Sequence, residues 1–255
     1  MLLPIPGKSA MAPEAAATSS IRNELLGGLP PGDLDRVRAL LTSVTMVSGQ
    51  VLHEPGEVVE HVYFPTRGMV SIIAQEENGP TVEVGLIGRE GLVGSWILLD
   101  PQAIAFRKAL VQVTGAALRM PLSTFRQAVD QIPSLRTCCL LHVQALSVQI
   151  SQTAVCNARH TLPERCARWL LLAHDRADGD EIPLTQEYLS NMLAVRRPGV
   201  TVAASILHAA KLIDYSRGRI VIRDRTGLEG AACDCYRVVK VETGRLLRQL
   251  PEVAA

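Results

Sequence analysis

A basic segment around residue 200 carries the strongest chemical signal in the sequence. From Arg196 to Arg225 there are seven positive and two negative residues, a local charge of +5, whereas the whole chain has a formal net charge of +1. Positive charge gathered in this way favours contact with nucleic-acid phosphates. The guanidinium fork of Arg197 could bond guanine O6 and N7 together and so discriminate one base. The simpler alternative is that Arg196 and Arg197 form a solvated helix start.

Two short helices are predicted on either side of a tight turn at Ala194-Val195. Thr185 is expected to cap the first helix, and Arg196-Arg197-Pro198 is expected to open the second, which runs to about Lys211. Such a pair is a helix-turn-helix, whose second helix fits a major groove ~12 Å wide. The residues expected to face the core are Leu189, Leu193, Val202, Ile206 and Ala209.

A β-hairpin wing is predicted after the second helix. The strand-like runs 212–215 and 220–222 flank a basic turn, Ser216-Arg217-Gly218-Arg219. Arginines in such a turn are suited to phosphates, which gives affinity without sequence discrimination; an ordinary charged surface is the alternative. Thr201 could touch a thymine methyl group or a phosphate. The candidate DNA-binding residues are Thr185, Gln186, Arg196, Arg197, Pro198, Thr201, Arg217 and Arg219.

Residues 44–121 differ in pattern from this C-terminal segment. Short β-rich pieces alternate with glycines, and Val82, Val84 and Leu86 alternate with Glu83 and Gly85. Regular short strands with turn signals predict a compact antiparallel β-roll, similar to a jelly roll. A plain β-sandwich without any binding site would give the same pattern, so the alternative stays open.

A long helix is predicted from Pro133 to about Asn157, with Ser134 as its cap. Apolar residues fall on two stripes, which predicts two partners, the roll and a second copy of the helix. One helix buried in a single core is the alternative. The stripe assigned to the dimer is Leu140, Val143, Ser147, Ile150 and Ala154. The stripe left for the roll is Leu141, Ala145, Val148, Gln152 and Val155.

Length and composition indicate an α+β protein of two domains. The chain has 255 residues, 47% of them apolar, which is enough for two separate cores. The start lacks the pattern of a secretory signal, no apolar run is long enough to cross a bilayer, and six cysteines form no C-x-x-C pair. We therefore expect a cytoplasmic protein with reduced thiols. The expected units are a disordered arm at 1–20, a sensor roll at 21–132, a dimerisation helix at 133–158 and a DNA-binding domain with a C-terminal helix at 159–255.

Several segments resemble the Crp/Fnr family of bacterial transcription regulators. The similarity covers nearly all of residues 21–249 and is most specific in the helix-turn-helix. The segments that carry it are Tyr63-Phe64-Pro65, Gly88-Arg89-Glu90-Gly91-Leu92-Val93-Gly94, Glu164-Arg165-Cys166-Ala167-Arg168-Trp169-Leu170-Leu171, Leu184-Thr185-Gln186-Glu187-Tyr188-Leu189 and Val195-Arg196-Arg197.

The resemblance implies a cyclic-nucleotide-binding-like roll and a homodimer that reads a two-fold symmetric operator, with RNA polymerase as a further partner. Arg197 matches the guanine-reading arginine of the family, but Pro198 stands where an acidic residue usually follows. The operator half-site therefore need not be the commonest one in the family.

The resemblance also marks a possible ligand pocket that departs from the pattern of cyclic-AMP binders. Ser95, next to Gly94, falls at the position of the ribose-binding glutamate, and Arg107 falls at the phosphate-binding arginine. Ile150, followed by Ser151, falls where a threonine usually meets adenine. Because serine cannot fully replace a carboxylate and isoleucine offers no hydrogen bond, we expect no cyclic-AMP binding and an unknown small-molecule effector.

No metal and no cofactor are expected. The chain has no cysteine before Cys138, so the N-terminal iron–sulfur site of some relatives lacks ligands. Adjacent cysteines at 138 and 139 point about 100° apart on a helix, and Cys233 and Cys235 are taken as helical neighbours on different faces. The six histidines have no metal-binding spacing, with a haem role for His53 or His61 as a minor alternative.

Three classes of function compete. The leading hypothesis is a dimeric DNA-binding regulator, in which the state of the roll changes the pairing of the long helices and so the spacing of the recognition helices. The alternative is a ligand-sensing module that controls a partner protein and does not use its winged helix for DNA. An enzyme is disfavoured, since the sequence shows no nucleophile–base pair or phosphate-binding loop.

Overall fold

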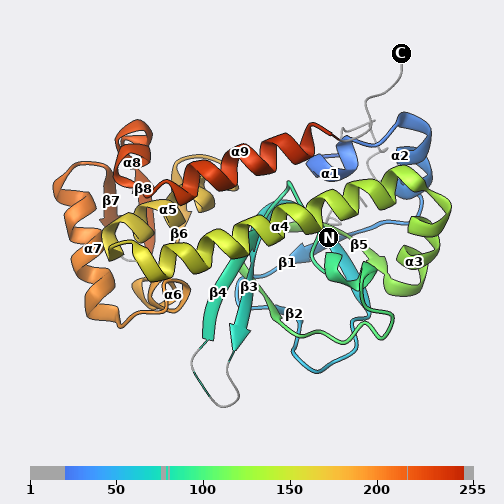
Figure 1. The fold of residues 1–255 in the computed structure, drawn as a ribbon, viewed down its shortest axis with the longest axis horizontal. Coiled ribbons are helices and arrows are strands. Elements are labelled where there is room, and N and C mark those ends of the chain that lie inside the picture. The colour runs from blue at the N-terminus through green and yellow to red at the C-terminus, as the bar shows by residue number, and fades with distance from the viewer. Residues whose placement is uncertain (1–20, 76–78, 80, 217, 250–255) are drawn as a thin grey trace, which may run out of the picture.

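The computed structural model describes residues 21–75, 79, 81–216 and 218–249. An antiparallel sheet domain and a helical C-terminal domain lie side by side, and one long helix, α4 (Pro133–Arg159), runs along both (Figure 1). The predicted α+β class is therefore confirmed. The predicted arm at 1–20 and the wing residue Arg217 lie outside the described residues.

The N-terminal sheet contains five strands in the order β1-β5-β3-β4, with β2 also paired to β5. All pairings are antiparallel, as predicted for the roll. The two long central strands approach each other closely at Gly68 and Gly115. A Cβ atom on Gly68 would lie 2.4 Å from the Val113 carbonyl oxygen, so this position has no room for a side chain. The strands are β1 (Thr42–Met46), β2 (Val51–His53), β3 (His61–Gln75), β4 (Thr81–Ile87) and β5 (Lys108–Pro121).

Short helices close the end of the roll (Figure 1). Pro31 occupies the first turn of α2, where its missing N–H is not required. Ser134 is predicted as the cap of α4 but does not occupy that position. Ile132 takes that position, and the Ser134 hydroxyl donates to Asp33 Oδ2 at 2.6 Å. These elements are α1 (Glu24–Gly27), α2 (Pro31–Arg38), the 3-10 helix η1 (Ser95–Leu98) and α3 (Leu122–Gln131).

The face of α4 that packs on the roll differs from the predicted stripe. Of the five residues assigned to the roll, only Ala145 is buried, whereas Leu141, Val148, Gln152 and Val155 are not. The buried stripe is Leu135, Cys138, Cys139, His142, Ala145, Leu146, Gln149, Thr153 and Cys156.

Polar side chains within this buried stripe explain why the stripe predicted to pack on the roll is wrong. Gln149 donates to the Leu86 carbonyl oxygen at 3.3 Å and accepts from the Leu86 amide, so it satisfies backbone groups of β4. The His142 ring meets the backbone of Leu92, and burial lowers the pKa of His142 to about 4, so that the ring is neutral. A pattern based on apolar residues passes over such positions.

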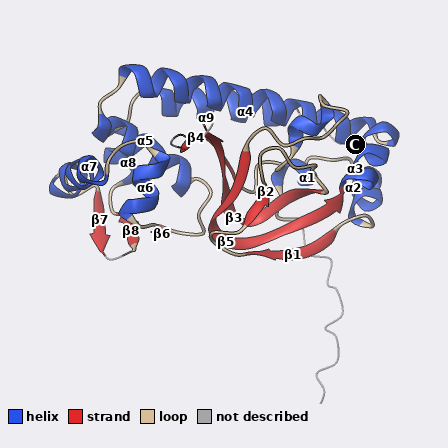
Figure 2. Ribbon diagram, turned by 90° about the horizontal axis from the view of Figure 1, so that it is seen from below, coloured by secondary structure: helices blue, strands red, loops and turns tan. Residues whose placement is uncertain are grey.

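The C-terminal domain is helical, with a small three-stranded sheet in the order β6-β8-β7. Its last helix, α9, turns back and lies beside α4 in the direction of the roll (Figures 1 and 2). In the described part of the chain no helix combines the length and apolarity needed to cross a membrane. The elements are α5 (Leu162–His174), β6 (Glu181–Pro183), α6 (Gln186–Met192), α7 (Arg197–Ala209), β7 (Ile213–Ser216), β8 (Arg219–Ile222), α8 (Arg225–Ala231) and α9 (Cys235–Leu247).

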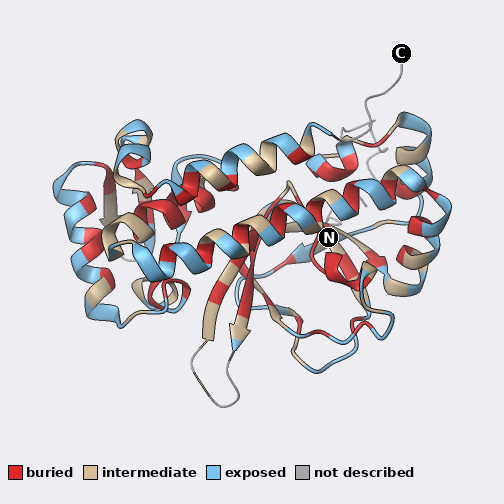
Figure 3. Ribbon diagram, viewed as in Figure 1, coloured by how far each residue is buried: buried red, intermediate tan, exposed pale blue. Residues whose placement is uncertain are grey.

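One hydrophobic core continues from the sheet into the C-terminal domain (Figure 3). Met69, Ile73 and Leu86 of the roll share this core with Trp169 and Leu170 of α5. A buried carboxyl group, Glu83 on β4, lies at the same junction. It accepts hydrogen bonds from Ser71 Oγ and from Trp169 Nε1, both at 2.6 Å. Burial raises the pKa of Glu83 to about 7 in spite of these bonds.

The raised pKa of Glu83 predicts a contribution to stability that falls as the pH rises. The folded protein binds this proton more tightly than the unfolded chain, whose pKa is 4.5, so the contribution of Glu83 to the free energy of unfolding declines between pH 4.5 and about 7. The lowered pKa of His142 contributes with the opposite sign, and Glu83→Gln leaves that contribution in place. We expect Glu83→Gln to remove this decline and to be the more stable protein at pH 8, by about 1–3 kcal/mol. Urea unfolding from pH 5 to pH 8 measures the effect.

The matched control is Glu57→Gln, because Glu57 is exposed. It should keep the pH dependence of the wild-type protein. Equal pH profiles for the wild type and Glu83→Gln would contradict the assignment of a neutral, buried carboxyl group at this junction.

Candidate nucleic-acid interface

The predicted helix-turn-helix is present as α6 and α7. The Thr185 hydroxyl caps α6 by accepting from the Tyr188 amide at 3.2 Å, as expected for a threonine before a helix. The chain then turns through Ala194, which has a φ of 51°. Arg196 occupies the position before α7, and Pro198 lies in its first turn.

The inward face of α7 is wrongly predicted. Val202 and Ile206 are 60% and 50% exposed, and Ala209 is exposed as well. The segment 200–210 is apolar almost throughout, so its sequence offers two possible inner faces and the core uses the other one. The buried residues of α7 are Val200, Ala203, Ala204 and Leu207.

The outer face of α7 therefore combines charged, hydroxyl and apolar groups. Arg196, Arg197 and Pro198 are exposed, and within the described part of the chain neither arginine has an acidic partner in an ion pair. The Thr201 hydroxyl lies 3.1 Å from Gln186 Oε1, which links the two helices at this surface. Guanidinium groups without a partner, beside apolar side chains that could contact thymine methyl groups, match the chemistry of a major groove.

The wing is present as the β7–β8 hairpin, but much of its charge is already paired. Arg219 is exposed and lies 3.5 Å from Glu181, and Arg223 lies 2.6 Å from Asp214. Among the described arginines of the segment 196–225, Arg196 and Arg197 at the start of α7 are the two without an acidic partner.

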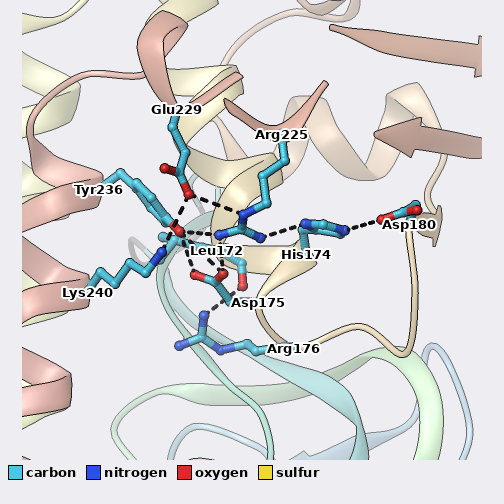
Figure 4. Close-up of polar contacts among 9 residues, drawn as sticks. All are labelled: Leu172, His174, Asp175, Arg176, Asp180, Arg225, Glu229, Tyr236 and Lys240. Atoms are coloured by element: carbon cyan, nitrogen blue, oxygen red, sulfur yellow. Dashed lines mark hydrogen bonds and ion pairs between the residues drawn. The ribbon is translucent and has the colours of Figure 1, made fainter. Parts of the chain in front are cut away.

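Arg225 belongs to an internal polar network and not to the DNA-facing surface (Figure 4). Its guanidinium donates to Asp175 Oδ1 at 2.6 Å and to the Tyr236 hydroxyl at 2.5 Å, and its Nη1 meets His174 Nδ1 at 2.6 Å. The Tyr236 hydroxyl in turn donates to Asp175 Oδ2 at 3.0 Å. The network fastens α8 and α9 to the end of α5, and so supports the domain that carries α7.

A second polar contact joins this domain to the roll. Arg176, just after α5, donates to Glu90 Oε1 through Nε at 2.8 Å, and its Nη2 lies 2.7 Å from the same oxygen. Both side chains are largely buried. Burial alone would raise the pKa of Glu90, but Arg176 and nearby backbone amides hold it below the ordinary value. This pair and the shared core fix α5 against the sheet.

The residues of the possible ligand pocket do not form one polar site. Gly94 has a φ of 96° and leads into the buried Ser95, while the Arg107 guanidinium lies 4.4 Å above the ring of its neighbour Phe106. On α4, Ile150 packs against the core of the roll, and Ser151 is exposed and donates to the Ser147 carbonyl oxygen. Within the described contacts, no hydrogen bond joins Arg107 to the other four residues.

A cavity of about 260 Å³ lies elsewhere on the roll. Its lining includes Glu54, Glu57 and Glu60, which would repel the phosphate of a cyclic nucleotide. The other lining residues are Leu52, His53, Val58, Val59, His61, Tyr63 and Ala105.

Fold and exposed site together define a protein with the architecture of a DNA-binding regulator. A family model described as the cyclic nucleotide-binding domain matches residues 43–132, and one described as the Crp-like helix-turn-helix domain matches residues 164–231. The chain belongs to the Crp/Fnr family of transcription regulators. No curated protein matches the sequence.

Solved structures of this family have the same fold. FixK2 from Bradyrhizobium japonicum matches with a TM-score of 0.65 at 17% identity, over 76% of this chain and 98% of that one. The c-di-GMP responsive regulator CLP from Xanthomonas campestris matches with a TM-score of 0.60 at 17% identity, over 75% and 98%. A Crp/Fnr-family regulator from Eubacterium rectale matches with a TM-score of 0.61 at 15% identity, over 81% and 96%.

The cap of α6 gives a test of how the candidate interface is built. Thr185→Ala removes the acceptor for the Tyr188 amide and should lower the free energy of unfolding by about 1 kcal/mol, whereas Thr185→Ser keeps the acceptor and should cost far less. Thermal and urea unfolding of the full chain measure both. Equal losses for the two variants would mean that the hydroxyl cap does not stabilise α6.

Proposed function

We propose that the protein is a sequence-specific, homodimeric transcription regulator that acts on a two-fold symmetric operator in the cytoplasm. The observation that carries this proposal is the exposed start of α7, where Arg196 and Arg197 have no acidic partner in the described structure and project with Thr201 from one end of a helix. A helix start of this kind delivers guanidinium groups to base edges, while the body of the helix stays anchored in the core.

Dimer formation through α4 is supported by a side of this helix that the described elements leave largely exposed (Figures 1 and 2). Leu140 is 41% exposed, Ser147 and Ala154 are exposed, and Val143 and Ile150 are only partly buried. Two copies related by a two-fold axis would present two α7 helices to half-sites about 34 Å apart. The rigid connection of α5 to the sheet would then convert any shift of the α4 pair into a change of that distance.

The roll is proposed to sense a small-molecule effector other than cyclic AMP. Ser95 and Ile150 lack the groups that would bind ribose and adenine. RNA polymerase is the further partner proposed from the family, and no enzymatic step is assigned to the chain. An effector would act by favouring one arrangement of the two α4 helices over another.

Base recognition by Arg197 can be tested on an operator selected from random DNA. Arg197→Ala should weaken operator binding by about 1–3 kcal/mol and relax one base position. Arg197→Lys retains the positive charge but loses the planar guanidinium. It should therefore restore the part of the affinity that comes from attraction to phosphates, but not the preference for one base. Fluorescence anisotropy over a range of salt concentrations measures both quantities.

Arg38→Ala serves as the control, since Arg38 is an exposed arginine of α2, at the end of the roll away from the helix-turn-helix (Figure 1). It should bind the operator like the wild type. Unchanged affinity and unchanged base preference in Arg197→Ala would refute the placement of α7 in the groove.

The dimer face gives a separate test. Leu140→Asp combined with Ala154→Asp places charges on exposed positions of α4, so the single chain should fold while the dimer dissociates. Sedimentation should then give a monomer, with operator affinity reduced at least tenfold. Thr137→Asp, exposed on another side of α4, should remain dimeric. A dimer that survives the double substitution would move the interface away from this face.

A further inference from the structure

The structure brings together four metal-ligating side chains near the turn between α4 and α5. Cys156 and His160 lie at the end of α4, and Cys233 and Cys235 lie where α8 leads into α9. Their ligand atoms, three Sγ and one imidazole nitrogen, all lie within 4.8 Å of one another. The three cysteines are buried as one cluster, and His160 is partly buried at its edge.

Cys233 and Cys235 do not lie on different faces of a helix, so the prediction from their spacing is wrong. Cys233 lies before α9 and Cys235 is its first residue, so the pair spans the corner where the chain turns into the helix. At such a corner two side chains that are two residues apart can point to the same place. Cys156 is 77 residues from Cys233, a separation that no short-spacing motif detects.

Two of the six distances between ligand atoms match the edges of a coordination tetrahedron, and the others are at most 4.8 Å. Cys156 Sγ lies 3.5 Å from Cys233 Sγ, and Cys235 Sγ lies 3.6 Å from His160 Nδ1. With Zn–S bonds of about 2.3 Å and Zn–N bonds of about 2.0 Å, those edges should be about 3.5–3.8 Å. All six cysteines are free, and 3.5 Å is well beyond the disulfide bond length of about 2.05 Å.

A buried arginine provides an independent sign of negative charge here. Arg168 is 5% exposed, and its Nη2 donates to Thr153 Oγ1, one turn of α4 before Cys156. Its Nε and Nη1 are buried without a hydrogen-bond partner, and the guanidinium is close enough to interact electrostatically with Cys156 and Cys235. Glu83 is also within electrostatic reach of Arg168, but its pKa of about 7 leaves that carboxyl largely neutral below this pH. A buried guanidinium without a full anion beside it is costly, so an anionic centre nearby would compensate it.

We propose that Cys156, His160, Cys233 and Cys235 bind one zinc ion as a Cys₃His site that clamps the start of α9 to the end of α4. Binding releases three thiol protons and forms three Zn–S bonds and one Zn–N bond, which leaves a complex of net charge −1 beside Arg168. Four protein ligands leave no open position, so the site is structural. A mononuclear ion fits better than a cubane iron–sulfur cluster, because there each cysteine binds a different iron and the sulfur atoms lie farther apart.

Metal analysis of the full-length protein tests this site directly. Protein purified with a reductant and without chelators should contain one zinc per chain by plasma mass spectrometry. Cys156→Ala should bind zinc at least about 100-fold more weakly in competition with a chelator. Cys139→Ala is the matched control, since Cys139 is also a fully buried cysteine of α4 but lies outside the cluster, and it should keep the full zinc content.

A cobalt titration covers the case in which a variant folds poorly. Co²⁺ added to metal-free wild-type protein should give a thiolate-to-cobalt charge-transfer band of the strength expected for three sulfur ligands, and the band should lose about one third in Cys235→Ala. Removal of zinc should lower the melting temperature of the wild type and of Cys139→Ala. A wild type without zinc and without the cobalt band, equal zinc loss in Cys139→Ala and Cys156→Ala, or a Cys156–Cys233 disulfide in its place would overturn the proposal.

Discussion

The burial of Trp169 at the junction of the two domains is the contact on which the rest of the structure depends. Trp169 is among the largest fully buried side chains, and its apolar surface is covered by both the roll and the C-terminal domain. Its indole N–H needs an acceptor, and Glu83 of the roll supplies it. Apolar burial therefore holds α5 on the sheet, and the buried hydrogen bond fixes the orientation in which it is held.

This contact constrains how a signal could pass through the molecule. A continuous core, the Glu90–Arg176 pair and α9 beside α4 together make the sheet and the helix-turn-helix one packed unit. A loose hinge between the sheet domain and the helix-turn-helix domain is not available without exposing that core to water. In the proposed dimer, rotation or translation of whole subunits against each other would cost much less, because packed units move more easily than they deform.

Local chemistry could be predicted from the sequence, and long-range packing could not. The cap at Thr185, the turn at Ala194 and the start of α7 depend on neighbouring residues, and all three are where the residue types predict them. The inner face of α7 was wrongly predicted because apolar residues occur on more than one side of the helix. The inner face of α4 was missed because Gln149 and His142 are buried to satisfy backbone groups of a distant strand and loop.

The candidate site shows the same difference between features set by neighbouring residues and features set by distant ones. Arg197 and Thr201 were predicted from the residues of one helix, and they share its exposed face. The partners of Arg219 and Arg225 come from β6 and from the end of α5, so a count of charges along one segment could not reveal that they are paired. Cys156 and Cys233 meet only because α9 folds back along α4, a topology that no residue pattern in the chain indicates.

Because α9 turns back along α4, its end lies close to the N-terminal domain. Thr243 and Leu247 of α9 line the same pocket as Glu24 of α1, so the last helix of the C-terminal domain ends beside the first helix of the roll. Two fluorescent dyes attached at the exposed positions Arg22 and Gln249 would report the distance between the two domains of one chain. Energy transfer between them would then separate internal rearrangement of a subunit from movement of one subunit against another.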